Sequence, residues 1–219
     1  MSPNFTVSCV MKYVIYTCVM TVVSLVNALI IQQYFKEKFE NTHIITLCLI
    51  LGVVAVLLLI FVKKIGSIFP LNHALFLFVV LSWSSGLAAT SELLKWSSLW
   101  AFLIAIFLAA LLVLVGYKLK MLSDIVKMII MLCAAAFILA ASILSMVIVH
   151  MKEKDQEHLK DAPCLLFIIG LLLVLLLVGQ YLKQCKVKQL SSSIYPLWLA
   201  LITWFALVLL YMSIHVMLI

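Results

Sequence analysis

The chain has 219 residues, of which 67% are hydrophobic and only 11% are charged. Its mean hydropathy is +1.31, and a soluble domain of this composition would expose large apolar patches. The net charge is +7, and all 15 basic residues are lysines. Because arginine is the residue that reads and stacks on bases, its absence argues against nucleic acid as a partner. The composition predicts an integral membrane protein whose first partner is the lipid bilayer.

Seven apolar stretches along the chain are each long enough to cross a bilayer as a helix, which needs about 20 residues. They cover residues 13–31, 44–62, 70–90, 97–116, 128–149, 164–181 and 196–214. Short polar connectors separate them, so residues 1–219 form a single transmembrane domain. We therefore predict an all-α, multi-pass membrane protein that folds as a bundle of seven transmembrane helices.

The distribution of lysines predicts how this bundle is oriented. With seven spans, nine lysines fall on the side of the N-terminus and six on the opposite side. The positive-inside rule then places the N-terminus in the cytosol. Asn4-Phe5-Thr6 is a glycosylation acceptor pattern, and its use would reverse this orientation. We treat a glycosylated Asn4 as the less favoured alternative.

The six cysteines show neither metal-binding spacing nor a disulfide framework. Cys185 differs from the others because it lies in the run KQCKVKQ beside a helix end, where cysteines can be palmitoylated. It is therefore a candidate palmitoylation site. His150 and His158 in a polar connector are eight residues apart, not four as in a zinc-binding helix. We expect no cofactor, no metal site and no catalytic residues, and hence no enzyme.

No Asp, Glu or Lys falls in the middle of a predicted span, although intramembrane charge often marks a functional site. The remaining polar residues are mild and lie toward the span ends. Asn27, His73 and Gln180 are the candidates for polar groups at a membrane mouth. Each can also hydrogen-bond a neighbouring helix, which contributes roughly 0.6–2 kcal/mol.

Small residues recur at helical spacing in two of the stretches. Ser82, Gly86 and Thr90 follow one another every four residues, so they share one helix face. Ala136 and Ala140 repeat this spacing in the fifth stretch. Because small side chains let a second helix approach closely, we expect both stripes to pack against neighbouring helices.

The start of the third stretch resembles a known family. A basic pair precedes the motif Phe69-Pro70-Leu71-Asn72, and Gly86 follows late in the apolar helix. This pattern resembles the third helix of the Bax inhibitor-like proteins, also called the transmembrane BAX inhibitor motif or Lifeguard family. The resemblance implies seven closely spaced helices, a cytosolic N-terminus, and a protein of an endomembrane or of the plasma membrane. Of these two locations we favour an endomembrane such as the ER or Golgi. It also implies a role in restraining cell death and in releasing calcium.

The chain departs from that family where the calcium leak is governed. The family uses two aspartates, one at the end of helix six and one within helix seven, which share protons. The matching positions here hold Val178 and Ile202. The chain therefore resembles a divergent member without the paired aspartates, and a proton-gated calcium latch is not expected.

Three functional hypotheses follow. The leading one is a divergent Bax inhibitor-like protein that modulates cell death or intracellular calcium handling through membrane-protein partners or self-association. The first alternative is a calcium leak channel or small-solute carrier, with Asn72 and His73 at its mouth. The second alternative is a seven-helix receptor.

Overall fold

A computed structural model describes residues 8–35, 42–61, 70–90, 96–149, 159, 161–187 and 194–218. These residues are almost entirely helical and contain no strand, which confirms the all-α prediction. The helices are α1 (Cys9–Ile30), α3 (Thr42–Phe61), α5 (Leu71–Thr90), α6 (Trp96–Lys118), α7 (Asp124–Val149), α9 (Asp161–Val187) and α10 (Ile194–Leu218), and a short π-helix, η1 (Ile31–Phe35), extends α1. Each α-helix overlaps one of the predicted apolar ranges.

Five of these helices are long and apolar enough to cross a membrane: α1 with η1, α6, α7, α9 and α10. The apolar stretches of α3 and α5 are shorter, covering residues 46–59 and 71–85. An integral membrane protein with several spanning helices is therefore supported by length and composition.

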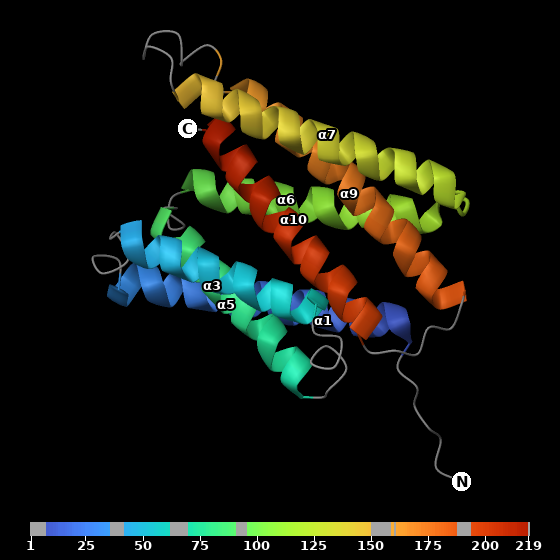
Figure 1. Ribbon diagram of the computed structural model, residues 1–219, viewed down its shortest axis with the longest axis horizontal. Coiled ribbons are helices and arrows are strands. Elements are labelled where there is room, and N and C mark those ends of the chain that lie inside the picture. The colour runs from blue at the N-terminus through green and yellow to red at the C-terminus, as the bar shows by residue number, and fades with distance from the viewer. Residues whose placement is uncertain are drawn as a thin grey trace.

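Helix α10 occupies the centre of the bundle. Figure 1 shows α1, α3 and α5 on one side and α6, α7 and α9 on the other, with α10 crossing diagonally between the two groups. It packs against α1, α6 and α9. In its most apolar window 67% of the residues are buried, against 11% for α7. The outer helices, α7 above all, thus leave their apolar side chains facing outward, as helices in lipid do.

Local sequence explains where several helices begin. Ser8 caps α1, because its Oγ accepts a hydrogen bond from the Met11 amide at 3.2 Å. Pro70 directly precedes α5, and its carbonyl accepts the Ala74 amide at 3.1 Å. Proline suits this place because it has no amide hydrogen to leave unpaired in the first turn.

Aromatic rings join α5 to the central helix. The ring of Trp83 stacks on that of Trp204, with centroids 6.4 Å apart and planes 14° apart. Phe76 meets Trp198 edge to face, with centroids 5.0 Å apart. Such pairs contribute about 0.5–1.5 kcal/mol beyond the area they bury. These ring contacts therefore attach α5 to α10, while α1 packs on α10 directly.

Two glycines bring the backbones of α6 and α9 together. A Cβ atom added at Gly116 would collide with the carbonyl oxygen of Leu176, and one added at Gly179 would collide with that of Val113. Since the obstructing atoms belong to backbone, they cannot move aside as a side chain can. Glycine at both positions is what allows α6 and α9 to pack this closely.

The two predicted stripes of small residues differ in their burial. Ser82 is buried on α5, whereas the surroundings of Gly86 and Thr90 lie outside the described residues. Ala136 and Ala140 are exposed on α7, so they do not pack against another helix of the described chain. The buried alanines of α7 are instead Ala134 and Ala141. Because α7 is apolar on all sides, its sequence does not reveal which face packs.

We predict that Gly179→Ala destabilises the protein by roughly 1–3 kcal/mol, since the added methyl group must push α6 and α9 apart. The measurement is the melting temperature of the protein in detergent, followed by fluorescence-detected gel filtration. Ala136→Leu on the exposed face of α7 is the control and should melt like the parent chain. An unchanged melting temperature for Gly179→Ala would disprove the close α6–α9 contact.

Candidate functional site

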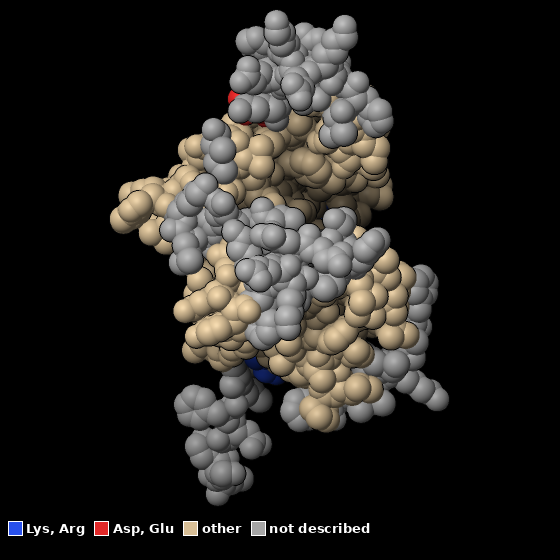
Figure 2. All heavy atoms as spheres, turned by 90° about the vertical axis from the view of Figure 1, so that its left-hand side faces the viewer, with Lys and Arg blue, Asp and Glu red and all other residues tan. Residues whose placement is uncertain are grey.

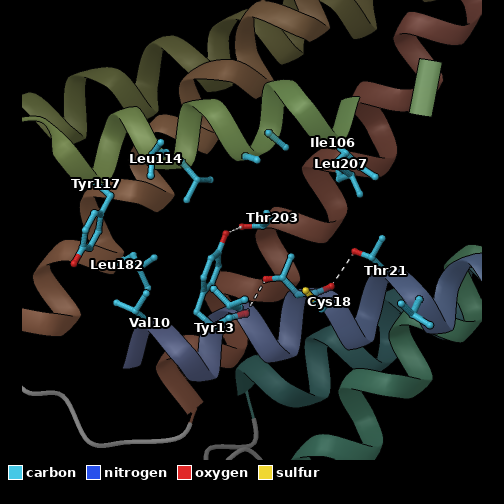
Figure 3. Close-up of a pocket in the computed structure, with 16 residues that line it drawn as sticks. Val10, Tyr13, Cys18, Thr21, Ile106, Leu114, Tyr117, Leu182, Thr203 and Leu207 are labelled. Atoms are coloured by element: carbon cyan, nitrogen blue, oxygen red, sulfur yellow. Dashed lines mark hydrogen bonds between the residues drawn. The ribbon is translucent and has the colours of Figure 1, made fainter. Parts of the chain in front are cut away.

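An apolar groove lies between α1 and α6, and its volume is about 550 Å³. This lies within the usual range for small-ligand sites, roughly 300–1,000 Å³. Figure 3 shows α1 and α6 on opposite sides of the groove. Its lining residues are Val10, Tyr13, Val14, Thr17, Cys18, Thr21 and Val22 from α1, Ile106, Ala109, Ala110, Val113, Leu114 and Tyr117 from α6, Leu182 from α9, and Thr203 and Leu207 from α10.

The hydroxyl groups in the groove bond to the protein itself. The Tyr13 and Thr203 hydroxyls lie 2.9 Å apart and join α1 to α10, as Figure 3 shows. Thr203 Oγ1 also donates to the Leu199 carbonyl at 2.9 Å. Thr17 and Thr21 donate to carbonyls four residues earlier in α1, at 2.9 and 2.8 Å. With these bonds made inside the wall, the groove presents a largely hydrocarbon surface.

One end of the groove lies at the N-terminal face, meaning the end of the bundle where α1, α7 and α10 start and α6 and α9 finish. Here the groove is lined by Val10, Tyr117 and Leu182. Two of them directly precede a lysine, Lys118 on α6 and Lys183 on α9. The Lys183 ammonium donates to the Leu119 carbonyl at 2.6 Å, so positive charge lies at the end of α6, where Tyr117 lines the groove.

Gln180 is fully buried at the same face and holds the turn between α6 and α7. Its Nε2 donates to the carbonyls of Gly116 at 2.6 Å and Lys120 at 3.3 Å. Its Oε1 accepts the Leu122 amide at 3.0 Å. Because these backbone groups follow the end of α6, the amide side chain satisfies groups that a helix end leaves unpaired. The structure thus gives Gln180 a structural role beside the groove rather than a place in its lining.

Lys127 is the one buried lysine among the described residues, in the first turn of α7. Its Nζ donates to Asp124 Oδ1 at 3.1 Å and to Gln184 Oε1 at 3.3 Å. It also lies 5.6 Å from the centre of the Tyr181 ring. The Asp124 side chain is 91% exposed, so this carboxylate faces outward rather than into the bundle.

The other polar candidates also contact neighbouring helices. Asn27 Nδ2 donates to Ser84 Oγ at 2.8 Å and Ser85 Oγ at 2.9 Å, which joins α1 to α5. The His73 ring lies between Asn72 Oδ1, at 2.6 Å from Nδ1, and the Tyr16 hydroxyl, at 3.2 Å from Nε2. Of the family-like motif, Asn72 is buried and Pro70 is exposed, while Phe69 lies outside the described residues.

The structure corrects the interpretation of Cys185. Its sulfur is bonded to that of Cys9, 176 residues away, and the residue is fully buried. A thiol in a disulfide is not available for palmitoylation, so this prediction does not hold for the state described. The bond fastens the start of α1 to the end of α9 beside the groove. No spacing in the sequence pointed to this pair, because cysteine pairing depends on which helices meet.

A second polar group lies at the opposite end of α10. Ser98 Oγ lies 3.5 Å from His215 Nδ1 and 3.4 Å from Nε2. A hydroxyl equidistant from both ring nitrogens is not aligned with the lone pair of either, as proton transfer requires. Tyr211 stacks on His215, and its hydroxyl has no hydrogen-bond partner among the described residues.

The described residues contain no group of three or more His, Cys, Asp or Glu side chains that could hold a metal ion. Val178, which the resemblance matches to the first aspartate of Bax inhibitor-like proteins, is buried. Ile202, at the second, is 40% exposed. The two positions therefore do not share one buried pocket in this fold. Asn4, the glycosylation candidate, lies outside the described residues.

Comparison of the chain with known protein families, with curated proteins and with solved structures gave no match. The interpretation of this site therefore rests on its own geometry.

We predict that four cysteines react with maleimide in denaturant without reductant, and all six after reduction. Cys9→Ser should raise the first number to five, because it frees Cys185. The measurement is the mass shift of the purified chain, which would also reveal an acyl group. Six reactive thiols before reduction would show that the Cys9–Cys185 bond is absent.

Proposed function

We propose that the chain is a non-enzymatic, non-conducting membrane protein that acts through lipid and membrane-protein contacts. Because its third helix resembles that of Bax inhibitor-like proteins, we propose that the process it modulates is cell death or intracellular calcium handling. The observation that carries the proposal is the apolar character of the bundle around α10. A divalent cation crossing it would find no carboxylate along the way among the described residues.

The placement of charge supports this proposal. Every described charged side chain lies near a helix end or in the turn between α6 and α7. Asp124 faces outward, and Asp161 is in the first turn of α9. The surface in Figure 2 is likewise almost free of charge among its described atoms. Because unpaired ions are costly in hydrocarbon, a path without counter-charges is a barrier to calcium.

The exposed surface supports action through neighbours in the membrane. On α7, exposed apolar side chains recur from the first turn to the last, including Ile125, Met128, Leu132, Ile143 and Met146. Such a surface must be covered by lipid or by another membrane protein. Self-association and binding of a partner are both compatible with this outer face.

The proposed topology has seven spans, with the N-terminal face in the cytosol and the chain in an endomembrane. Nine of the lysines belong to this face, which the positive-inside rule favours. The Cys9–Cys185 disulfide argues for the opposite side, since disulfides persist mainly in oxidising compartments. We give the lysines more weight because Cys185 is fully buried, and exchange with glutathione requires access to a sulfur atom.

We predict that the purified chain in calcium-loaded vesicles releases calcium no faster than empty vesicles do, at neutral and at mildly acidic pH. The reason is the absence of carboxylates along the described part of the bundle. The measurement is the fluorescence of an external calcium indicator, with an ionophore added at the end as a positive control. A robust leak that acid closes would contradict the proposal and restore the channel hypothesis.

We also predict the position of the two termini. In microsomes, a glycosylation acceptor fused after Ile219 should be modified, and one fused before Met1 should not, because seven spans place the termini on opposite sides. The readout is the shift in gel mobility that a glycosidase reverses. Modification of the N-terminal acceptor, or of Asn4, would show that the disulfide rather than the lysine count reports the orientation.

A further inference from the structure

We infer that the groove between α1 and α6 binds one acyl chain of an anionic glycerophospholipid, with the lipid phosphate beside Lys118 and Lys183. The inference depends on the chain lying in a bilayer, but not on whether it conducts calcium. Two independent observations carry it, namely the apolar groove and the charge at one end of it.

The groove suits a hydrocarbon chain. Its walls are apolar side chains, and Tyr13, Thr17, Thr21 and Thr203 bond within the protein, so none of these hydroxyls requires a polar ligand. Small residues such as Ala109 and Ala110 on α6 leave the space that larger side chains would fill. A cavity of about 550 Å³ in a bilayer is filled by lipid rather than left empty.

The groove opens on the outer surface of the bundle, where the surrounding membrane lipid is the available ligand. Val14 and Val22 on α1 are 46% and 58% exposed, and Leu114 on α6 is 55% exposed. All three line the groove, so its open side is a lipid-facing surface rather than a mouth toward water. A phospholipid can therefore enter laterally without leaving the bilayer.

Charge complementarity selects an anionic headgroup. Lys118 and Lys183 directly follow Tyr117 and Leu182, which line the groove at the N-terminal face. Lys183 Nζ is already fixed by a 2.6 Å bond to the Leu119 carbonyl, so this cation is held in place. The four helices that line the groove contain one carboxylate among their described residues, Asp161, at the opposite end of α9. Each lysine near a membrane surface favours anionic lipid by about fivefold.

The test is photolabelling of the full chain in bilayers with phosphatidylserine that carries a diazirine on one acyl chain. Adducts are mapped by mass spectrometry of peptides. We expect labelling to concentrate on the groove residues of α1 and α6. Phosphatidylcholine with the same diazirine chain should label these residues several-fold less. Similar labelling of groove and outer α7 residues by both lipids would overturn the inference, because it would show only bulk lipid.

Matched variants test separately where the acyl chain and the headgroup of the lipid lie. Ala110→Phe fills the groove from an exposed position and should abolish the concentrated labelling, whereas Ala136→Phe on the exposed face of α7 should leave it unchanged. Lys118→Gln should lower the preference for phosphatidylserine over phosphatidylcholine by about fivefold. Lys12→Gln should leave the preference unchanged, because Lys12 lies about half a turn around α1 from the groove residue Val10. Gel filtration of each variant verifies that it remains folded.

A third probe distinguishes a phospholipid from a free fatty acid, since both carry an acyl chain and a negative charge. A diazirine fatty acid offers one acyl chain and one negative charge without the glycerophosphate. If it labels the groove as well as phosphatidylserine does, the occupant is a free fatty acid and the phospholipid assignment is overturned. Unchanged groove labelling in Ala110→Phe would show that the acyl chain does not lie in the groove, and would overturn the inference.

Discussion

The packing of this bundle depends on polar groups finding partners inside the protein, since hydrocarbon offers none. Asn27 bonds the serines of α5, Tyr13 bonds Thr203 of α10, and Gln180 of α9 bonds the end of α6. Each contact joins two helices that are distant in sequence. Together with the Gly116 and Gly179 contact, they determine which helices meet. The apolar side chains alone would not distinguish these pairings from others, because lipid is as apolar as they are.

The same contacts explain why a groove exists. Tyr13 holds α1 to α10, and α6 also packs against α10, while the glycine contact pulls α6 toward α9. Both α1 and α6 are thus fixed to the centre, with the groove between them. The disulfide from Cys9 to Cys185 then fastens α1 to α9 at the lysine-rich end. An apolar space that ends in positive charge is a consequence of how the helices are joined.

Much of the helix layout could be predicted from sequence, because long apolar runs allow few alternatives in a membrane. The helix ends are predicted less accurately, because α9 continues through Lys183 to Val187, beyond the predicted range 164–181. Lys127 precedes the predicted range 128–149, yet it is buried in the first turn of α7, where its ammonium donates to Asp124 and Gln184. Charged residues at a helix end can continue the helix when a neighbour satisfies them.

The groove and the disulfide could not be predicted for a different reason. The groove combines residues of α1, α6, α9 and α10, and the two cysteines are 176 residues apart. Neither leaves a local pattern, because both depend on tertiary packing. Gln180 was recognised as a notable polar residue from sequence, but its partners at the end of α6 became visible only in the structure.

The most direct test of the account is the water accessibility of position 203 at the centre of the bundle. Thr203→Cys, in a chain whose four free cysteines are replaced by alanine, is exposed to a membrane-impermeant thiosulfonate reagent from each side. Lys120→Cys at the exposed turn serves as the reactive control. We predict rapid modification at position 120 and none at position 203, since the interior holds hydrocarbon and no aqueous path. Rapid modification at position 203 would contradict the apolar bundle.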